Sequence, residues 1–313
     1  LKSVPTIKNL SENIFNALTK FTPPIPPEPV TRIFFIFNYY SNVILLIINQ
    51  LYLMEKQYVF LSHDVDWSFN GPSKEHILNR KDRFDVKLFD TTPIHKLYHN
   101  FLEYMDIEDK FDVKSTFFFR TQYENGDYTD YQNDINDLIR GGWEIGLHTD
   151  PSSINKIEKI KKEKNDLEKL TKSKIKGNRV HYLSNDIQLL KKLNELDFIY
   201  DSSNKKNKSN ITMDDMGFSQ IDGIIEFPVT LMDAYLFTHM NISEEKIISI
   251  VKETLNSCRN LNSDFNIMSI LWHDNVLKMK GGRMYPKILE FLSSQDDVII
   301  CSGIELANKI KYK

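Results

Sequence analysis

The sequence predicts an α/β fold in which a parallel sheet is surrounded by helices. The chain has 313 residues, of which 41% are hydrophobic, so it can bury a large core and is not disordered over most of its length. Beyond residue 57, short β-rich runs alternate with longer helical patterns. Seven or eight such β/α units in about 250 residues are the size of a barrel, and an open doubly wound sheet is the alternative.

The N-terminal part of the chain predicts an extension that is separate from this fold. Apolar residues from Ile7 to Leu18 recur at helical spacing and predict an amphipathic helix. Five prolines between residues 23 and 29 then predict a stiff polyproline connector. We therefore expect an extension over residues 1–56 and a catalytic barrel over residues 57–313.

Residues 33–54 contain no charged side chain, and a segment of this length could just cross a bilayer. Five polar residues interrupt it, however, and these are costly in hydrocarbon. This composition favours packing on a protein core first, contact with a membrane interface second, and a true span last. No secretory signal is visible, so we expect a cytoplasmic location, with residues 33–54 as the candidate for peripheral membrane contact.

The charge and cysteine content argue against several classes of function. Forty Lys and Arg against 43 Asp and Glu give a formal net charge of -3 without a basic stripe, so nucleic acid is not an expected partner. The two cysteines, Cys258 and Cys301, form no CxxC motif, which excludes a disulfide framework and a cysteine-based zinc site. The glycine spacing contains neither of the two common phosphate-binding motifs.

The β-rich runs predict eight strands, which are separated by turns and helical patterns. The predicted strands lie at 58–61, 113–119, 143–147, 177–182, 198–200, 224–229, 267–272 and 298–301. The predicted helices lie at 94–105, 154–170, 186–196, 243–255 and 284–292.

Ionisable residues follow several of these strands, at the end where a parallel β/α fold places its functional groups. Asp64 and Asp66 share one face because strand side chains alternate, whereas His63 points to the other face. Two neighbouring carboxylates imply a cation or a shared proton. One of them, together with His148 and His181, forms a ligand set typical of a catalytic zinc ion, and the other aspartate is then free to act as a base.

Each residue has a commoner structural explanation when it is taken alone. An Asp pair after a strand usually forms a turn or a cap, a single His is usually a hydrogen-bonded core residue, and Arg179 could pair with a surface acid. The recurrence of His and Asp at successive strand ends favours a functional site.

These residues resemble the NodB-type polysaccharide deacetylases, also called carbohydrate esterase family four, and more narrowly the branch with an SHDVD first motif. The similarity runs from about residue 58 to the C-terminus, with the motifs in family order. They are SHDVDW at 62–67, STFFF at 115–119, GGWEIGLH at 141–148, GNRVHYL at 177–183, YDSS at 200–203, EFPVTLMD at 226–233 and LWHDN at 271–275. The resemblance implies a distorted (β/α)7-type barrel that binds one divalent metal and removes acyl groups from sugars.

The resemblance also implies a role for each metal-site residue. Asp66 matches the family's metal-binding aspartate, and His148 matches its first metal-binding histidine. The family's second histidine, four positions further on, is Ser152 here. We expect His181 to replace it, and we expect the metal to be zinc.

The remaining roles concern proton transfer. By resemblance, Asp64 matches the catalytic base, Arg179 the arginine that orients this base, and His273 the general acid. Asp201 lies where an acid often tunes the imidazole of that histidine.

The expected activity is the metal-dependent hydrolysis of an amide bond, in which an N-acetyl or related acyl group leaves a sugar during surface-glycan biosynthesis. The expected partner is a polysaccharide, another N-acylated sugar, or a lipid- or nucleotide-linked sugar. One alternative is an inactive deacetylase-like protein that binds carbohydrate or acts as a scaffold, and another is a deformylase or amidase that acts on a different amide.

Overall fold

The computed structural model describes residues 56–312, except residues 185–186 and 262. The predicted amphipathic helix, proline connector and uncharged segment therefore lie outside the described residues. Among the helices that are described, none combines the length and the hydrophobicity that crossing a membrane requires.

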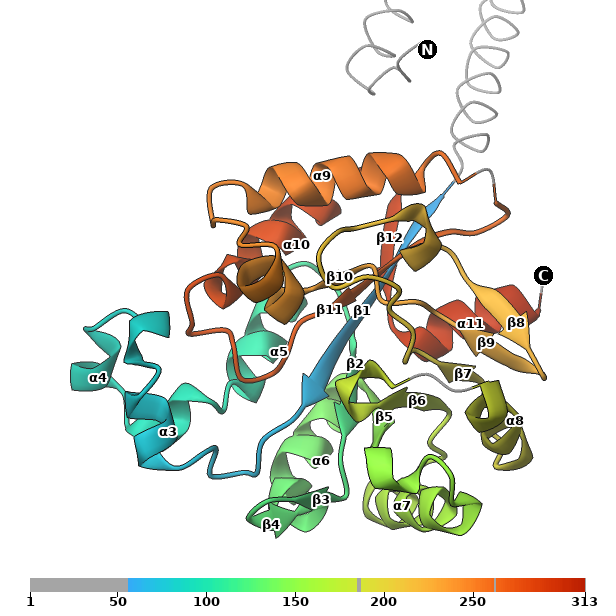
Figure 1. Ribbon diagram of the computed structural model, residues 1–313, viewed down its shortest axis with the longest axis horizontal. Coiled ribbons are helices and arrows are strands. Elements are labelled where there is room, and N and C mark those ends of the chain that lie inside the picture. The colour runs from blue at the N-terminus through green and yellow to red at the C-terminus, as the bar shows by residue number, and fades with distance from the viewer. Residues whose placement is uncertain (1–55, 185–186, 262, 313) are drawn as a thin grey trace, which may run out of the picture. The chain divides into compact units, whose positions relative to one another are not determined.

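A mostly parallel sheet forms the centre of the fold, as Figure 1 shows. Its strand order is β10-β11-β1-β2-β5-β6-β7-β9-β8, and β12 also pairs with β1. Of the pairs in this sheet, β8 with β9 is antiparallel and the others are parallel. The strands are β1 (Gln57–Val65), β2 (Thr116–Phe119), β5 (Glu144–Thr149), β6 (Gly177–Val180), β7 (Tyr200–Asp201), β8 (Ser219–Ile221), β9 (Ile224–Glu226), β10 (Leu231–Met232), β11 (Asn266–Leu271) and β12 (Val298–Cys301).

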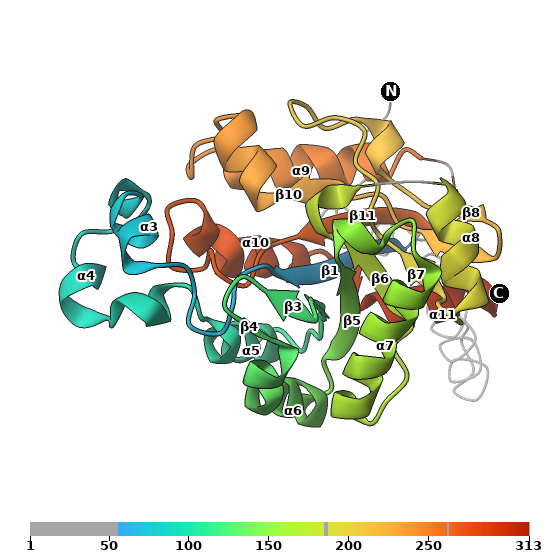
Figure 2. The same cartoon turned by 60° about the horizontal axis from the view of Figure 1, so that its bottom comes forward.

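Helices surround this sheet, and Figure 2 shows them from a second direction. They are α3 (Lys74–Leu78), α4 (Leu88–Thr91), α5 (Phe101–Asp109), α6 (Gln132–Gly141), α7 (Ile157–Thr171), α8 (Ile187–Glu195), α9 (Ile247–Cys258), α10 (Tyr285–Ser293) and α11 (Gly303–Lys311). A small hairpin of β3 (Gln122–Tyr123) and β4 (Gly126–Asp127) precedes α6. All eight predicted strands are present, and the predicted distorted β/α barrel is confirmed.

Strand β1 is the central strand because it pairs with three others. Its first four residues pair with β12, its last four pair with β2, and β11 runs along its other side. A strand bonded on both sides over most of its length has little freedom to shift its register. The residues that follow β1 are therefore held in a defined position at the carboxyl end of the sheet.

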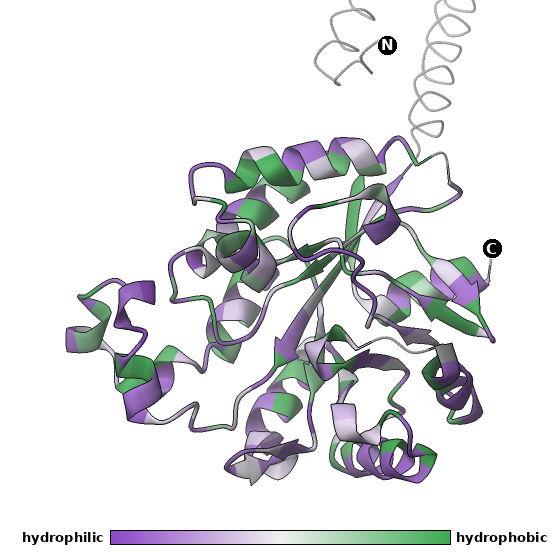
Figure 3. Ribbon diagram, in the orientation of Figure 1, coloured by the Kyte–Doolittle hydropathy of each residue, from purple (hydrophilic) through white to green (hydrophobic). Residues whose placement is uncertain are grey.

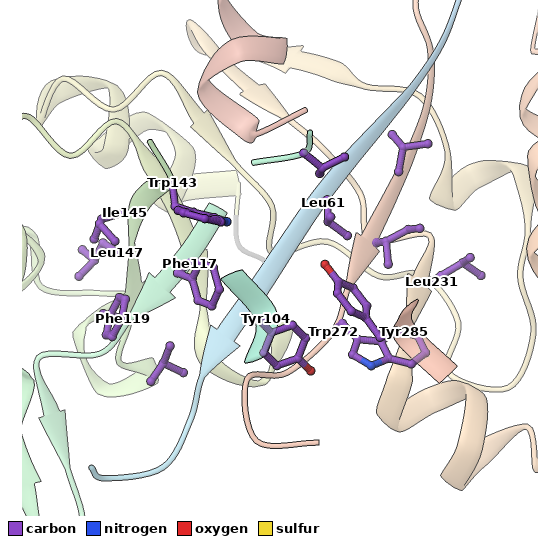
Figure 4. Packing of buried hydrophobic residues seen from close by; sticks show 14 of the residues in the cluster. Leu61, Tyr104, Phe117, Phe119, Trp143, Ile145, Leu147, Leu231, Trp272 and Tyr285 are labelled. Atoms are coloured by element: carbon purple, nitrogen blue, oxygen red, sulfur yellow. The ribbon is translucent and has the colours of Figure 1, made fainter. Parts of the chain in front are cut away.

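Alternation along β1 separates two parts of the core. Val59, Leu61 and Val65 belong to the main hydrophobic cluster, which Figure 4 shows around Leu61 and Phe117. Phe60 points to the other face, where it contacts Tyr200 at a ring-centroid distance of 5.7 Å. The helices are amphipathic, and Figure 3 shows hydrophobic and hydrophilic residues mixed along α7 and α9.

A polar cluster is buried between β1 and α5. The carboxylate of Glu108, which has no exposed surface, accepts hydrogen bonds from the ring of His63 (2.8 Å) and the hydroxyl of Tyr285 (2.6 Å). It also accepts bonds from the indole of Trp143 at 2.7 Å and from Ser115 at 3.0 and 3.1 Å. These donors come from widely separated elements, so one buried carboxylate joins the strand and helix layers.

We predict that Glu108→Ala strongly destabilises the protein, because the substitution leaves the buried ring of His63 and several other buried donors without an acceptor. The expected loss in the free energy of unfolding is about 3–5 kcal/mol, measured by urea denaturation. The control is Glu103→Ala on the same helix, whose exposed carboxylate pairs with Lys278 and should contribute less than about 1 kcal/mol. Equal losses in the two variants would contradict the assigned importance of Glu108.

Candidate metal centre

Three potential ligands meet at the carboxyl ends of β1, β5 and β6. Asp66 directly follows β1, His148 lies within β5, and His181 directly follows β6. Oδ1 of Asp66 lies 3.2 Å from Nε2 of His148 and 3.1 Å from Nδ1 of His181, and the two nitrogens are 3.1 Å apart. This metal triad could hold a metal ion.

A hydrogen bond to the backbone fixes the orientation of the His148 ring. Its Nδ1 lies 3.0 Å from the carbonyl oxygen of Arg179. Because a carbonyl oxygen only accepts, Nδ1 carries a proton, and Nε2 is the nitrogen that faces the other two potential ligands. A backbone carbonyl thus sets the orientation of this ring.

His181 is positioned by a sharp turn. Strand β6 ends at Val180, so His181 is the first residue after the strand rather than part of it. The next two residues, Tyr182 and Leu183, have positive φ angles of 66° and 52°, which are rare for residues other than glycine. The ring of Tyr182 packs on His181 at a centroid distance of 3.8 Å and remains 79% exposed.

The charge on Asp66 is stabilised by its neighbours. Burial by itself raises the pKa of this carboxyl group. The charge of His273 and the hydrogen bonds from His148 and His181 outweigh burial and lower the pKa well below its ordinary value. Asp66 is therefore ionised at neutral pH.

Asp64 lies beside the triad and is held by a fully buried guanidinium group. Arg179 donates from Nη1 to Oδ1 of Asp64 at 2.9 Å and to the hydroxyl of Ser62 at 2.9 Å. Its Nε and Nη2 donate to the carbonyl and hydroxyl oxygens of Ser202, both at 2.8 Å. The second oxygen of Asp64 lies 3.7 Å from Nε2 of His148, so Asp64 has one oxygen bound to Arg179 and the other near the triad.

His273 faces the triad from the other side, after β11. Its Nε2 lies 3.5 Å from Oδ2 of Asp66, and its Nδ1 lies 2.7 Å from Oδ1 of Asp233. Burial by itself lowers the pKa of this imidazole, but the charges of Asp233 and Asp66 raise it to about 10. His273 is therefore a cationic proton donor next to the triad.

Asp201, which we expected beside His273, lies elsewhere, and this expectation is corrected. Its carboxylate accepts bonds from Asn178 at 2.6 Å and from the backbone and hydroxyl of Ser203 at 3.1 and 2.9 Å. The reason is strand order: Asp201 lies in β7, whereas Asp233 follows β10, which is the neighbour of β11. The quoted EFPVTLMD motif ends at Asp233 and contained the signal that was missed.

We predict that His181→Ala abolishes stoichiometric metal binding, because it removes one of three ligands. The measurement is metal content by elemental analysis of the purified chain after metal loading. His95→Ala, a change at an exposed histidine outside the triad, is the control and should leave the content unchanged. Full occupancy in His181→Ala would exclude His181 as a required ligand.

Comparisons with solved structures support the fold. The chain is similar to a protein from Mycobacterium smegmatis whose crystal structure is described as a polysaccharide deacetylase, with a TM-score of 0.59 and 18% identity over 83% of this chain and 91% of that one. It is also similar to a 4-alpha-glucanotransferase from Thermococcus litoralis, with a TM-score of 0.52 and 15% identity over 82% of this chain and 41% of that one.

Neither the scan against protein-family models nor the search of curated proteins finds a match. The two structural similarities are at low sequence identity and therefore concern the fold. The first of them agrees with the NodB-type resemblance of the motifs, and the chain has the fold of the polysaccharide deacetylases.

Proposed function

We propose that this protein is a metal-dependent deacetylase that hydrolyses an N-acetyl or related amide on a sugar. The observation that carries the proposal is the combination of the metal triad, a carboxylate held by Arg179, and an imidazolium held by Asp233. A binding groove alone needs neither a base nor an acid, whereas amide hydrolysis needs both. The fold of a solved polysaccharide deacetylase supports the same class of reaction.

The spacing of the triad suits zinc. Zinc binds nitrogen and oxygen ligands at about 2.0–2.2 Å in tetrahedral sites, so two ligand atoms of one ion lie about 3.3 Å apart. The donor atoms of the triad are separated by 3.1–3.2 Å. Two imidazoles and one carboxylate also leave a fourth position open, as catalytic zinc sites do.

When bound, the ion would polarise the acyl carbonyl and lower the pKa of a water molecule toward about 7. Asp64 accepts the proton of the attacking water through the oxygen that Arg179 does not hold. Arg179 keeps this carboxylate aimed toward the triad. His273 then gives a proton to the departing amine, which is otherwise a poor leaving group.

The substrate that we propose is an N-acylated sugar of a surface glycan, as a polysaccharide or as a lipid- or nucleotide-linked precursor. The exposed ring of Tyr182 beside the triad offers a face on which a sugar ring could stack. Trp272, by contrast, is 1% exposed and donates to the carbonyl of Gly282, so its role is packing. The cytoplasmic location and the membrane contact through residues 33–54 stay predictions.

The test is a measurement of the zinc content of the purified protein, followed by activity assays on a panel of amide substrates. We expect about one zinc per chain and release of free amine from at least one N-acetylated sugar. A metal-free protein with no turnover would favour the alternative of an inactive carbohydrate-binding or scaffolding protein. Turnover of formamides or other non-sugar amides alone would favour the deformylase or amidase alternative.

We predict that Asp64→Asn keeps zinc bound and lowers kcat by about 10²–10⁴-fold, because the amide cannot accept the proton of the attacking water. Zinc content and steady-state kinetics are measured on the same preparation. Loss of the metal from this variant would instead make Asp64 a ligand.

We predict that Asp233→Asn shifts the alkaline limb of the pH–rate profile to lower pH. The general acid must be protonated, and Asp233 raises the pKa of His273, so removing this charge lets the imidazole lose its proton at a lower pH. The expected shift is about one unit or more. Asp201→Asn, which changes a buried carboxylate bound to Asn178 and Ser203, is the control and should leave the limb in place.

A further inference from the structure

Three successive backbone carbonyls around His273 each accept a hydrogen bond from a buried side chain. The carbonyl of Trp272 accepts from Nδ1 of His63 at 2.6 Å, and that of His273 accepts from the hydroxyl of Tyr104 at 2.8 Å. The carbonyl of Asp274 accepts from the amide of Asn100 at 2.9 Å. The three donor residues have no exposed surface.

These donors are organised by α5. Asn100 is the N-cap of the helix, and Tyr104 and Glu108 follow at intervals of four residues, which places all three on one face. Glu108 acts through His63, whose Nε2 lies 2.8 Å from its carboxylate. From Asn100 to Glu108, the helix residues meet the carbonyls in the order 274, 273 and 272. One helix face therefore bonds the whole segment, directly at 274 and 273 and through His63 at 272.

The backbone N–H groups of the same segment are bonded as well. Trp272 donates to the carbonyl of Ser62 at 3.0 Å, and Asp274 donates to the carbonyl of Asp64 at 3.2 Å. His273 donates to Asp233 at 2.8 Å. All six backbone polar groups of residues 272–274 therefore have a protein partner, although the sheet strand ends one residue earlier, at Leu271.

Such complete bonding constrains where the imidazole of His273 can lie. Asp233 sets the direction of the ring and also accepts a bond from the backbone N–H of His273. The bonds from α5 approach the backbone from another element, and the bond from His63 connects it to β1, which carries Asp64 and ends directly before Asp66. The proposed base, one member of the metal triad and the backbone of the proposed acid are therefore all connected to the same strand.

We propose that Asn100, Tyr104 and the His63–Glu108 pair are positioning residues that hold the backbone of His273 so that its imidazole reaches the leaving amine. The inference rests on the proposed deacetylase function. Proton transfer depends steeply on the distance between donor and acceptor, so a small displacement of the ring lowers the rate of the step that needs the acid. It has little effect on a step that needs no acid.

The test compares two substrates of zinc-loaded Tyr104→Phe, a change that removes only the hydroxyl bonded to His273. One substrate is the best N-acetylated sugar of the panel, whose amine must be protonated to leave. The other is p-nitrophenyl acetate, whose phenolate leaves without a proton. We expect kcat for the sugar to fall about tenfold or more with KM nearly unchanged, while ester hydrolysis stays within about twofold.

Tyr200→Phe is the matched control. Tyr200 is also fully buried, and its hydroxyl donates to Glu144 at 2.9 Å, far from His273 in the strand order. This variant loses a buried hydrogen bond of the same kind and should keep the wild-type ratio of sugar to ester turnover. Asn100→Ala, which removes a second donor of the same helix face, should lower the ratio as Tyr104→Phe does.

A second measurement separates the positioning from the activity itself. In ¹H–¹⁵N spectra of the imidazole groups, we expect the His273 signals to shift in Tyr104→Phe and to stay in place in Tyr200→Phe. Unchanged signals together with an unchanged substrate ratio would overturn the positioning inference. A wild-type protein that cleaves neither substrate would overturn the proposed function, and the spectra would still decide the positioning.

Discussion

A charged guanidinium group enclosed by the sheet determines how the site is arranged. Arg179 has no exposed surface, and a buried cation is tolerated only where its hydrogen bonds are satisfied. Its donors are taken by Ser62 and Asp64 of β1 and by Ser202 after β7, and the ring of Phe118 lies 4.5 Å away. Its carbonyl orients His148. One residue therefore holds the proposed base and orients one of the proposed metal ligands.

Strand β1 serves the site from both of its faces. Asp64 and Asp66 point toward the interior, where they meet Arg179 and the triad. His63 points outward and connects Glu108 of α5 to the backbone next to His273. Because side chains alternate along a strand, one face of β1 carries the proposed base and the other face carries the proposed support of the His273 backbone.

Much of this arrangement could be predicted from local patterns. The strand ends, the shared face of Asp64 and Asp66, and the approach of His148 and His181 follow from period-two alternation and from the parallel β/α pattern. Helices α6 and α11 were not predicted, although local signals exist: a Ser302–Glu305 capping box starts α11, and Gly142 with φ 92° ends α6. Both helices have only nine or ten residues, so each contains few repeats of apolar residues at helical spacing.

By itself, the sequence determined the strands and the face on which each β1 side chain lies, because these depend on neighbouring residues and a regular repeat. Only the tertiary structure decided that Asp233 rather than Asp201 meets His273, because that contact depends on β10 lying beside β11. The bonds from α5 to the carbonyls of residues 273 and 274 were likewise invisible, since they join residues more than 160 positions apart. Strand order and helix packing are long-range properties that no local period encodes.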